Sequence, residues 1–113
     1  MKYNYTTIDI RDSSGLSKFI ENLAKKFPYN DTFTANTHLN IPAHTHTDYE
    51  ARLFLEGNAT FTVENEIYEC GPGSYIEIDP GITHSFVYSG ITPLKVLRFF
   101  NEDNGWIADF CAN

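Results

Sequence analysis

The stretch HTHTDYEARLFLEG, residues 44–57, places two histidines two positions apart and a glutamate four positions after the second one. Successive side chains of a β-strand point to opposite faces, so His44 and His46 point the same way if they lie on a strand. The same parity relates Glu50 and Arg52 in the strand that follows. The pattern therefore predicts a cluster of metal-binding side chains with an arginine beside it.

A second segment, GPGSYIEIDPGITHSF at residues 71–86, contributes the further histidine His84. An isolated H-x-H pair is more often a surface or core pair than a metal site, but the glutamate and the third histidine reverse that balance. Three imidazoles and one carboxylate suit divalent first-row ions such as Fe2+, Ni2+, Mn2+, Co2+ or Zn2+, and they leave two positions of an octahedral shell open. We predict that the metal ligands are His44, His46, Glu50 and His84.

The composition indicates one small globular domain. A chain of 113 residues allows a single core, and 42% hydrophobic residues exclude a disordered chain. A net charge of -7 and eight scattered Lys and Arg residues argue against nucleic acid and anionic membranes as partners. We find no apolar run of about 18 residues and no signal peptide, so we expect a cytoplasmic protein that spans no membrane. We interpret Cys70 and Cys111 as reduced thiols without an assigned role.

One helix is predicted near the N-terminus. Its apolar positions recur at helical spacing, Ser13 or Ser14 is placed to cap its first turn, and Pro28 stops it. Its polar face is neither long nor strongly basic, which argues against a membrane-surface anchor. We expect the helix to cover the strands through its apolar side chains, which are Leu16, Phe19, Ile20, Leu23, Ala24 and Phe27.

Seven short strands follow the helix, separated by Gly, Pro, Asn and Asp. This spacing predicts a barrel or a sandwich, and hence an all-β fold with one N-terminal helix. We expect a single domain over residues 1–113, with an N-terminal strand and helix in 1–31, the barrel in 32–101 and a C-terminal segment in 102–113. The predicted strands are Thr32–Ile41, Tyr49–Leu55, Ala59–Val63, Ile67–Cys70, Tyr75–Ile78, His84–Tyr88 and Leu94–Phe100.

The strand that follows the two histidines has two different faces. Glu50, Arg52 and Phe54 share one face, and the positions between them are apolar. The polar face lines the expected metal site, so the apolar face needs cover from the helix or from another subunit. A homodimer is therefore one expectation. The apolar face consists of Ala51, Leu53 and Leu55.

Arg52 has two interpretations at this stage. It is either a structural partner of Glu50 or a group that matches an anionic ligand, because a buried charge is costly unless it is paired. Arg98, in the segment VLRFF, is either a second positive group in the same cavity or an ordinary surface residue.

The two histidine segments resemble the two sequence motifs of the cupin superfamily. The first reads H-x-H-x3-E-x6-G over residues 44–57, and the second reads G-x5-D-P-G-x2-H over residues 73–84. The resemblance implies a small cupin-type β-barrel, also called a double-stranded β-helix or jelly roll, with the two motifs on facing strands. We interpret His38 as a strand or turn histidine rather than a further ligand. The chain departs from the pattern at positions that touch no proposed ligand, namely His38, Asp79 and Tyr88.

Within the superfamily, the chain resembles the acireductone dioxygenases. Their motif H-x-H-x3-E-x-R-x-F matches residues 44–54, and their R-x-F followed by G-W-x-A matches residues 98–108. The resemblance implies the same metal ligands as those predicted above. It also implies that Arg52 balances an anionic substrate and that Trp106 lies over the substrate pocket. Phe86, beside the last histidine, and Arg98 complete the implied catalytic set.

This resemblance implies a reaction of methionine salvage, in which O2 cleaves an anionic enediolate. The iron form yields a 2-oxo acid and formate, whereas the nickel form yields a shorter acid, formate and carbon monoxide. The predicted ligands do not select between Fe2+ and Ni2+. Acireductone dioxygenases are longer on both sides of the barrel, and Asn40 and Ala43 depart from their pattern. Two other classes stay open: a different metallocupin enzyme and a non-catalytic module that binds a small anion.

Overall fold

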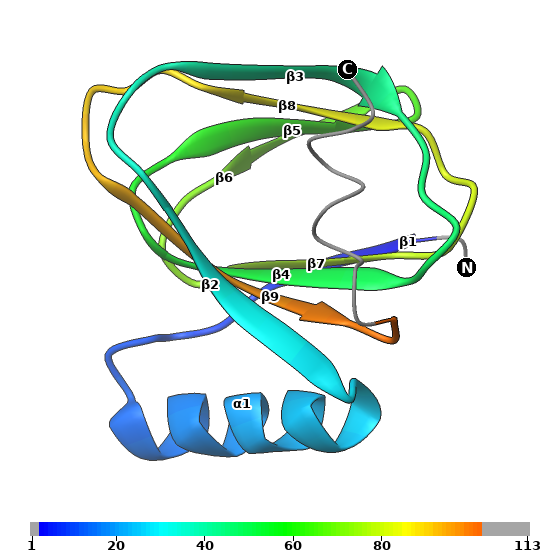
Figure 1. Ribbon diagram of the computed structural model, residues 1–113. Helices are drawn as coiled ribbons and strands as arrows, with labels where there is room; N and C mark the ends of the chain where they lie inside the picture. The colour runs from blue at the N-terminus through cyan, green and yellow to red at the C-terminus, as the bar shows by residue number, and fades with distance from the viewer. Residues whose placement is uncertain (1–2, 103–113) are drawn as a thin grey trace.

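The computed structural model, which describes residues 3–102, has two antiparallel β-sheets packed face to face and a helix outside them (Figure 1). The expected all-β fold with one N-terminal helix is confirmed. One sheet has the strand order β1-β7-β4-β9-β2 and the other has the order β3-β8-β5-β6. In chain order the elements are β1 (Tyr3–Thr7), α1 (Ser13–Lys26), β2 (Tyr29–Ala35), β3 (Leu39–His44), β4 (Glu50–Glu56), β5 (Ala59–Val63), β6 (Glu66–Cys70), β7 (Ser74–Ile78), β8 (His84–Tyr88) and β9 (Leu94–Phe100).

The two sheets enclose an apolar interior and meet at both edges. On one side the chain passes directly from β2 into β3, and on the other side aromatic rings join β1 to β6. There, the ring of Tyr5 stacks on that of Tyr68 with their centroids 4.5 Å apart. The largest interior side chains come from both sheets, so the core ties the layers together. They include Phe54, Phe61, Ile76, Ile78, Tyr88, Leu94 and Val96.

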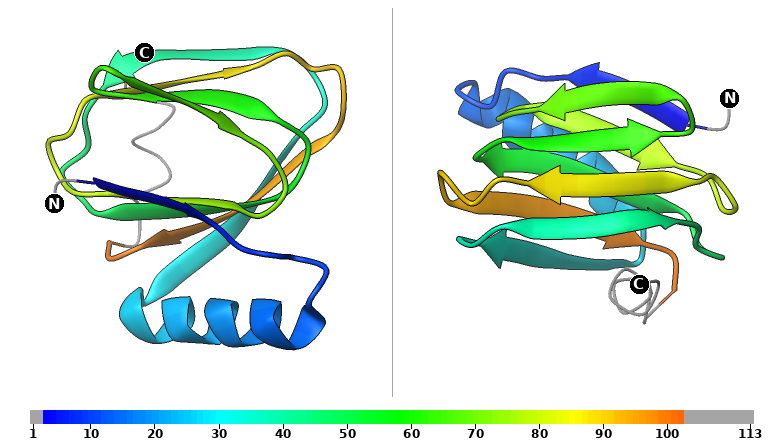
Figure 2. Two further views of the ribbon diagram at one scale, coloured as in Figure 1. Left: turned by 180° about the vertical axis from the view of Figure 1, so that it is seen from behind. Right: turned by 90° about the horizontal axis from the view of Figure 1, so that it is seen from above.

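Helix α1 lies on the outer face of the five-stranded sheet, away from the other sheet (Figures 1 and 2). Its buried Leu23 and the Phe27 that ends it pack in one cluster with Ala51 and Leu53 of β4. Of the two covers expected for this apolar face, the helix is therefore the one observed, and the homodimer stays a prediction. Burying one such side chain contributes about 1.5–3 kcal/mol to stability.

The residue that caps the helix is one position before the serines predicted to cap it. The N-cap is Asp12, whose Oδ1 accepts a hydrogen bond from the Gly15 backbone N at 3.2 Å. The prediction of Ser13 or Ser14 is wrong because the Asp12 carboxylate, one residue before Ser13, already binds a free amide of the first turn.

One predicted strand, Thr32–Ile41, is two strands in the structure. β2 ends at Ala35 and β3 begins at Leu39, and the chain changes sheets between them. The crossing passes close to Gly90, where a Cβ atom would lie 2.6 Å from the His38 backbone N. The other predicted strands agree with the structure to within one residue at each end.

Candidate metal centre

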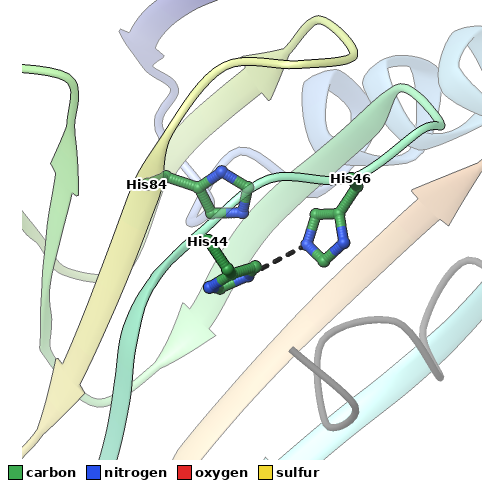
Figure 3. A group of neighbouring side chains, drawn as sticks. All are labelled: His44, His46 and His84. Atoms are coloured by element: carbon green, nitrogen blue, oxygen red, sulfur yellow. Dashed lines mark hydrogen bonds between the residues drawn. The ribbon is translucent and has the colours of Figure 1, made fainter. Parts of the chain in front are cut away.

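Three histidines from three segments meet at one end of the barrel. His44 is the last residue of β3, His84 is the first residue of β8, and His46 lies in the connection before β4. One ring nitrogen from each lies within 4.8 Å of the others. Their imidazoles point toward one another, and the Nε2 atoms of His44 and His46 are 3.0 Å apart (Figure 3). Neighbouring strands align the first and last of these histidines, since His44 is the register partner of His84.

Backbone carbonyls fix the orientation of two of these rings. Nδ1 of His44 is 2.7 Å from the carbonyl oxygen of Pro42, and Nδ1 of His84 is 2.9 Å from that of Ile82. A carbonyl can only accept, so each Nδ1 carries the proton and donates it. This leaves Nε2 of each ring facing the cluster, which is the arrangement that metal-binding histidines use.

Glu50 lies directly beside this cluster and is only 2% exposed. Its Oε1 is 3.1 Å from Nε2 of His84, and its Oε2 is 3.5 Å from Nε2 of His46. The carboxylate therefore approaches two of the three imidazoles. Its role as a fourth ligand stays a prediction.

The donor atoms fit a divalent cation. Nε2 of His84 is buried and makes no hydrogen bond with the part of the chain that the structure describes, residues 3–102. With Nδ1 donating to a carbonyl, Nε2 of His84 faces a carboxylate oxygen of Glu50 at 3.1 Å, a contact that is favourable when a proton or a metal cation lies between the two atoms. The separations of 3.0 and 3.1 Å are also suitable, because ligands about 2.1 Å from an ion and at about right angles lie about 3 Å apart. Imidazole and carboxylate donors suit first-row divalent metals.

Arg52, two residues along β4, binds the same carboxylate. Its Nη2 and Nε donate to Oε1 of Glu50 at 2.9 and 3.3 Å. The guanidinium also lies 5.3 Å from the ring centroid of Phe61 on the facing sheet. Of the two interpretations of Arg52, the structural pairing with Glu50 is thus observed directly, and the contact with an anionic substrate stays a prediction.

Arg98 is buried at 3% exposure, so the alternative of an ordinary surface residue is wrong. Its Nε and Nη2 donate to the two carboxylate oxygens of Asp31 on β2, at 2.9 and 2.8 Å. Its guanidinium lies 4.9 Å from the ring centroid of Phe33 and 5.6 Å from that of Phe100. Arg98 is the register partner of Arg52, so two guanidiniums stand side by side in the same sheet, each with its own carboxylate.

A cavity of about 20 Å³ adjoins His44, His84 and both arginines. This volume accommodates about one water molecule. Phe86, predicted beside the last histidine, lines this cavity, and its ring lies 5.7 Å from that of Phe61. The cavity therefore has a cationic and imidazole side and an apolar side. Its lining consists of His44, His84, Arg52, Arg98, Phe33, Leu39, Ile41, Phe61 and Phe86.

The remaining sequence predictions concern Trp106, Cys111, His38 and Cys70. Trp106 and Cys111 are outside the described residues, so their predicted roles stay untested. His38 is exposed in the connection between β2 and β3, as expected for a turn histidine. Burial raises the pKa of the Cys70 thiol to about 12, so the group stays protonated, in agreement with a reduced thiol.

The contacts of two acidic side chains, the partly buried Asp31 and the buried Asp48, were not predicted from the sequence. Asp31 binds Arg98, and Asp48 accepts hydrogen bonds from the backbone N–H groups of Asn101 and Glu102. The parity of Asp31 with the apolar Phe33 on one strand was the available signal for an inward orientation. Nothing in the local sequence marks the partners of Asp48.

The family model described as "Cupin domain" matches residues 33–100. The chain belongs to this family. Among curated relatives, it is 35% identical over 77 residues to an acireductone dioxygenase of Hydrogenobaculum sp., covering 65% of this cupin chain and 42% of the relative. It is 38% identical over 78 residues to an acireductone dioxygenase of Granulibacter bethesdensis, covering 65% and 43% of the two chains. The cupin chain thus spans about two fifths of the length of these relatives.

Solved structures support the cupin fold. An acireductone dioxygenase from Bacillus anthracis, with a cadmium ion in its active centre, superposes with a TM-score of 0.71 at 19% identity, over 92% of this chain and 80% of that one. KdgF from Halomonas sp. gives a TM-score of 0.58 at 14% identity, over 66% and 69% of the two chains. The expected cupin-type barrel is therefore confirmed. Within residues 3–102, the single helix is too short and too polar to cross a membrane.

Proposed function

We propose that this cupin chain carries the metal centre of an acireductone dioxygenase-type enzyme, which uses O2 to cleave a small anionic enediolate to a 2-oxo acid and formate. The main supporting observation is the convergence of His44, His46 and His84, with Glu50 against two of the three rings. Similarity to curated acireductone dioxygenases gives the reaction class. Because the chain spans about two fifths of those relatives, the activity itself is a proposal.

The three histidines and Glu50 would hold the ion through three neutral nitrogens and one carboxylate. Bound there, a divalent metal supplies a Lewis acid that stabilises an enediolate. We propose Fe2+ or Ni2+ as the native ion, with Mn2+, Co2+ and Zn2+ as others that the same donors accept.

The charges of the site favour an anion once a divalent cation is present. The guanidiniums of Arg52 and Arg98 are balanced by the carboxylates of Glu50 and Asp31. A divalent ion therefore leaves a net positive charge in a buried site, where electrostatic interactions are stronger than in water. In this proposal Arg52, which already contacts Glu50, orients the carboxylate and faces the bound anion.

The apolar side of the cavity keeps water away from the reacting groups. The ring of Phe61 stacks on the imidazole of His84 with centroids 5.7 Å apart, and the ring of Phe86 packs edge-on against that of Phe61. Excluding water protects a reactive intermediate and strengthens the interactions of charged groups. A cavity of about 20 Å³ is too small for a metabolite, so entry requires the partly buried Phe33, Leu39 and Ile41 to move.

Several finer assignments accompany this proposal. A place in methionine salvage is expected from the resemblance to acireductone dioxygenases, and a cytoplasmic location is the expectation made from the sequence. The expected partners are the small anionic substrate and O2, with a homodimer as a further prediction. The implied role of Trp106 over the substrate pocket also belongs to the proposal.

A different metallocupin enzyme is the second candidate. It is favoured by the pairing of both arginines with carboxylates, which leaves each guanidinium already neutralised before any substrate arrives. Such an enzyme would use the same metal ligands for a smaller or less charged substrate. A non-catalytic cupin that binds a small anion would share this site without turnover.

The test is reconstitution of the metal-free chain with Fe2+ and Ni2+ separately, followed by oxygen uptake with freshly made acireductone. We expect uptake with both ions and carbon monoxide in the headspace only with nickel. Full metal loading without oxygen uptake would contradict the dioxygenase proposal and favour the second candidate. Failure to bind either ion would contradict the metal centre itself.

A further inference from the structure

The connection between β3 and β4, residues 45–49, has no strand pairing of its own, although it carries His46 and leads into Glu50. Two contacts hold it. The carbonyl oxygen of His46 accepts a hydrogen bond from the Gly81 N–H at 2.9 Å, which ties the connection to the turn before His84. The second contact is made by the side chain of Asp48.

Asp48 is 7% exposed, and its Oδ2 accepts hydrogen bonds from the backbone N–H of Asn101 at 3.0 Å and of Glu102 at 2.8 Å. These amides follow immediately after β9, where the pairing of β9 with β4 ends at Phe100 opposite Glu50. A carboxylate that accepts two N–H groups in a buried place makes strong, charge-assisted hydrogen bonds. The side chain of Asp48 thus holds the connection between β3 and β4 in place of strand pairing. It does so between the two proposed ligands His46 and Glu50.

We propose that Asp48 is a positioning residue that couples metal binding to the end of β9. It holds the connection so that His46 and Glu50 face the other histidines, and the bound ion in turn holds the amides of residues 101 and 102. Coupling of this kind is reciprocal, because each event stabilises the arrangement that the other requires. The inference rests on the metal centre proposed above and adds a residue outside its ligands.

The first test compares two substitutions of Asp48 by titrating the metal-free full chain with Zn2+, a diamagnetic ion that the donors accept. Asp48→Asn keeps an oxygen that accepts both N–H groups, whereas Asp48→Ala removes it. We expect Asp48→Ala to weaken Zn2+ binding by about tenfold to 100-fold, as losses of groups that orient metal ligands do. Asp48→Asn should restore affinity to within about threefold of the original chain, since it keeps the acceptor.

The second test follows hydrogen exchange of the Asn101 and Glu102 amides by NMR. In the original chain, Zn2+ should slow their exchange, and in Asp48→Ala the ion should have little effect on it. Asp12→Ala is the matched control, because it removes a carboxylate that caps α1 far from the histidines. This control should lower thermal stability but leave Zn2+ affinity and the metal effect on exchange unchanged.

The outcomes separate the inference from the proposed function. If the original chain binds no Zn2+, the metal centre is wrong and the inference falls with it. If the original chain binds Zn2+ and Asp48→Ala binds it equally well, only the coupling is wrong. If Asp48→Ala does not fold, unchanged exchange at residues 101 and 102 on adding Zn2+ to the original chain overturns the coupling, and slower exchange supports it.

Discussion

Both sheets contribute apolar side chains to the interior, but the two buried arginines come from the five-stranded sheet, whose outer face is covered by α1, whereas the helix does not cover the outer face of the four-stranded sheet (Figure 1). Arg52 and Arg98 point inward from β4 and β9. On the outer side, α1 packs in one cluster with Leu53 of β4. The four-stranded sheet turns apolar rings inward and leaves residues such as Ile67, which is 68% exposed, without cover. The sheet that carries the buried guanidiniums is therefore the one packed on both faces, whereas the other sheet keeps one face in contact with solvent.

The proposed metal centre lies where these two sheets meet. His44 and His84 belong to the four-stranded sheet, whereas Glu50 begins the central strand of the other sheet. An ion bound by all of them would connect the sheets, and ligand binding to the folded state alone raises stability. Metal binding is therefore expected to stabilise the packing of the two sheets against each other.

The largest effect is expected from His84→Ala. This substitution removes one of the four proposed ligands and should remove most of the bound metal, together with the rise in melting temperature that the metal produces. Metal analysis of the purified chain and thermal unfolding with and without Zn2+ measure both effects. His38→Ala is the matched control and should keep its metal. Full metal content in His84→Ala combined with loss in His38→Ala would show that the ligand assignment is wrong.

Because only the five-stranded sheet has an outer face covered by the helix, truncating a side chain is expected to cost more stability on that face than on the outer face of the other sheet. Leu53→Ala, beneath α1, should lower the free energy of unfolding by about 2–5 kcal/mol because it leaves a cavity in a packed cluster. Ile67→Ala, on the uncovered face, should change it by less than about 0.5 kcal/mol. Urea titration monitored by far-UV circular dichroism measures the free energy of unfolding of both variants. Equal losses would mean that the outer face of the four-stranded sheet is buried in solution, as in a homodimer.

The buried arginine of β4 gives a test within the five-stranded sheet. Arg52→Met keeps much of the apolar stem but removes the charge, so turnover of an anionic enediolate should fall by about tenfold or more. Metal should stay bound, since the substitution leaves all four proposed ligands in place. Oxygen uptake at sub-saturating substrate and metal analysis separate the two properties. Unchanged turnover would assign Arg52 to the structural pairing with Glu50 alone.

Local periodicity made the histidines and most strands predictable from the sequence. The two-residue spacing of His44 and His46, and the bounds of β5, β8 and β9, follow from alternation and turn residues. The break between β2 and β3 was missed because no glycine or proline marks it, and the glycine that packs there is Gly90, far along the chain.

The carboxylates that complete the site could not be found in this way. Asp31 and Asp48 bind groups that lie 67 and 53 positions away in the sequence. A local pattern contains no information about such partners, because they are set by which strands become neighbours. The clustered histidines were therefore more predictable from the sequence than the contacts that hold the neighbouring segments in place.

The smallest effect concerns the helix that covers the five-stranded sheet. Asp12→Ala removes the carboxylate that caps α1 and should lower the free energy of unfolding by about 1 kcal/mol. Ser13→Ala and Ser14→Ala should each have a smaller effect, because in the structure these serines are already inside the helix. Urea titration of the three variants ranks them. A larger loss for either serine would restore the capping assignment made from the sequence, and an unchanged stability in Asp12→Ala would show that the packing of Leu23 and Phe27 on β4 holds the helix without its cap.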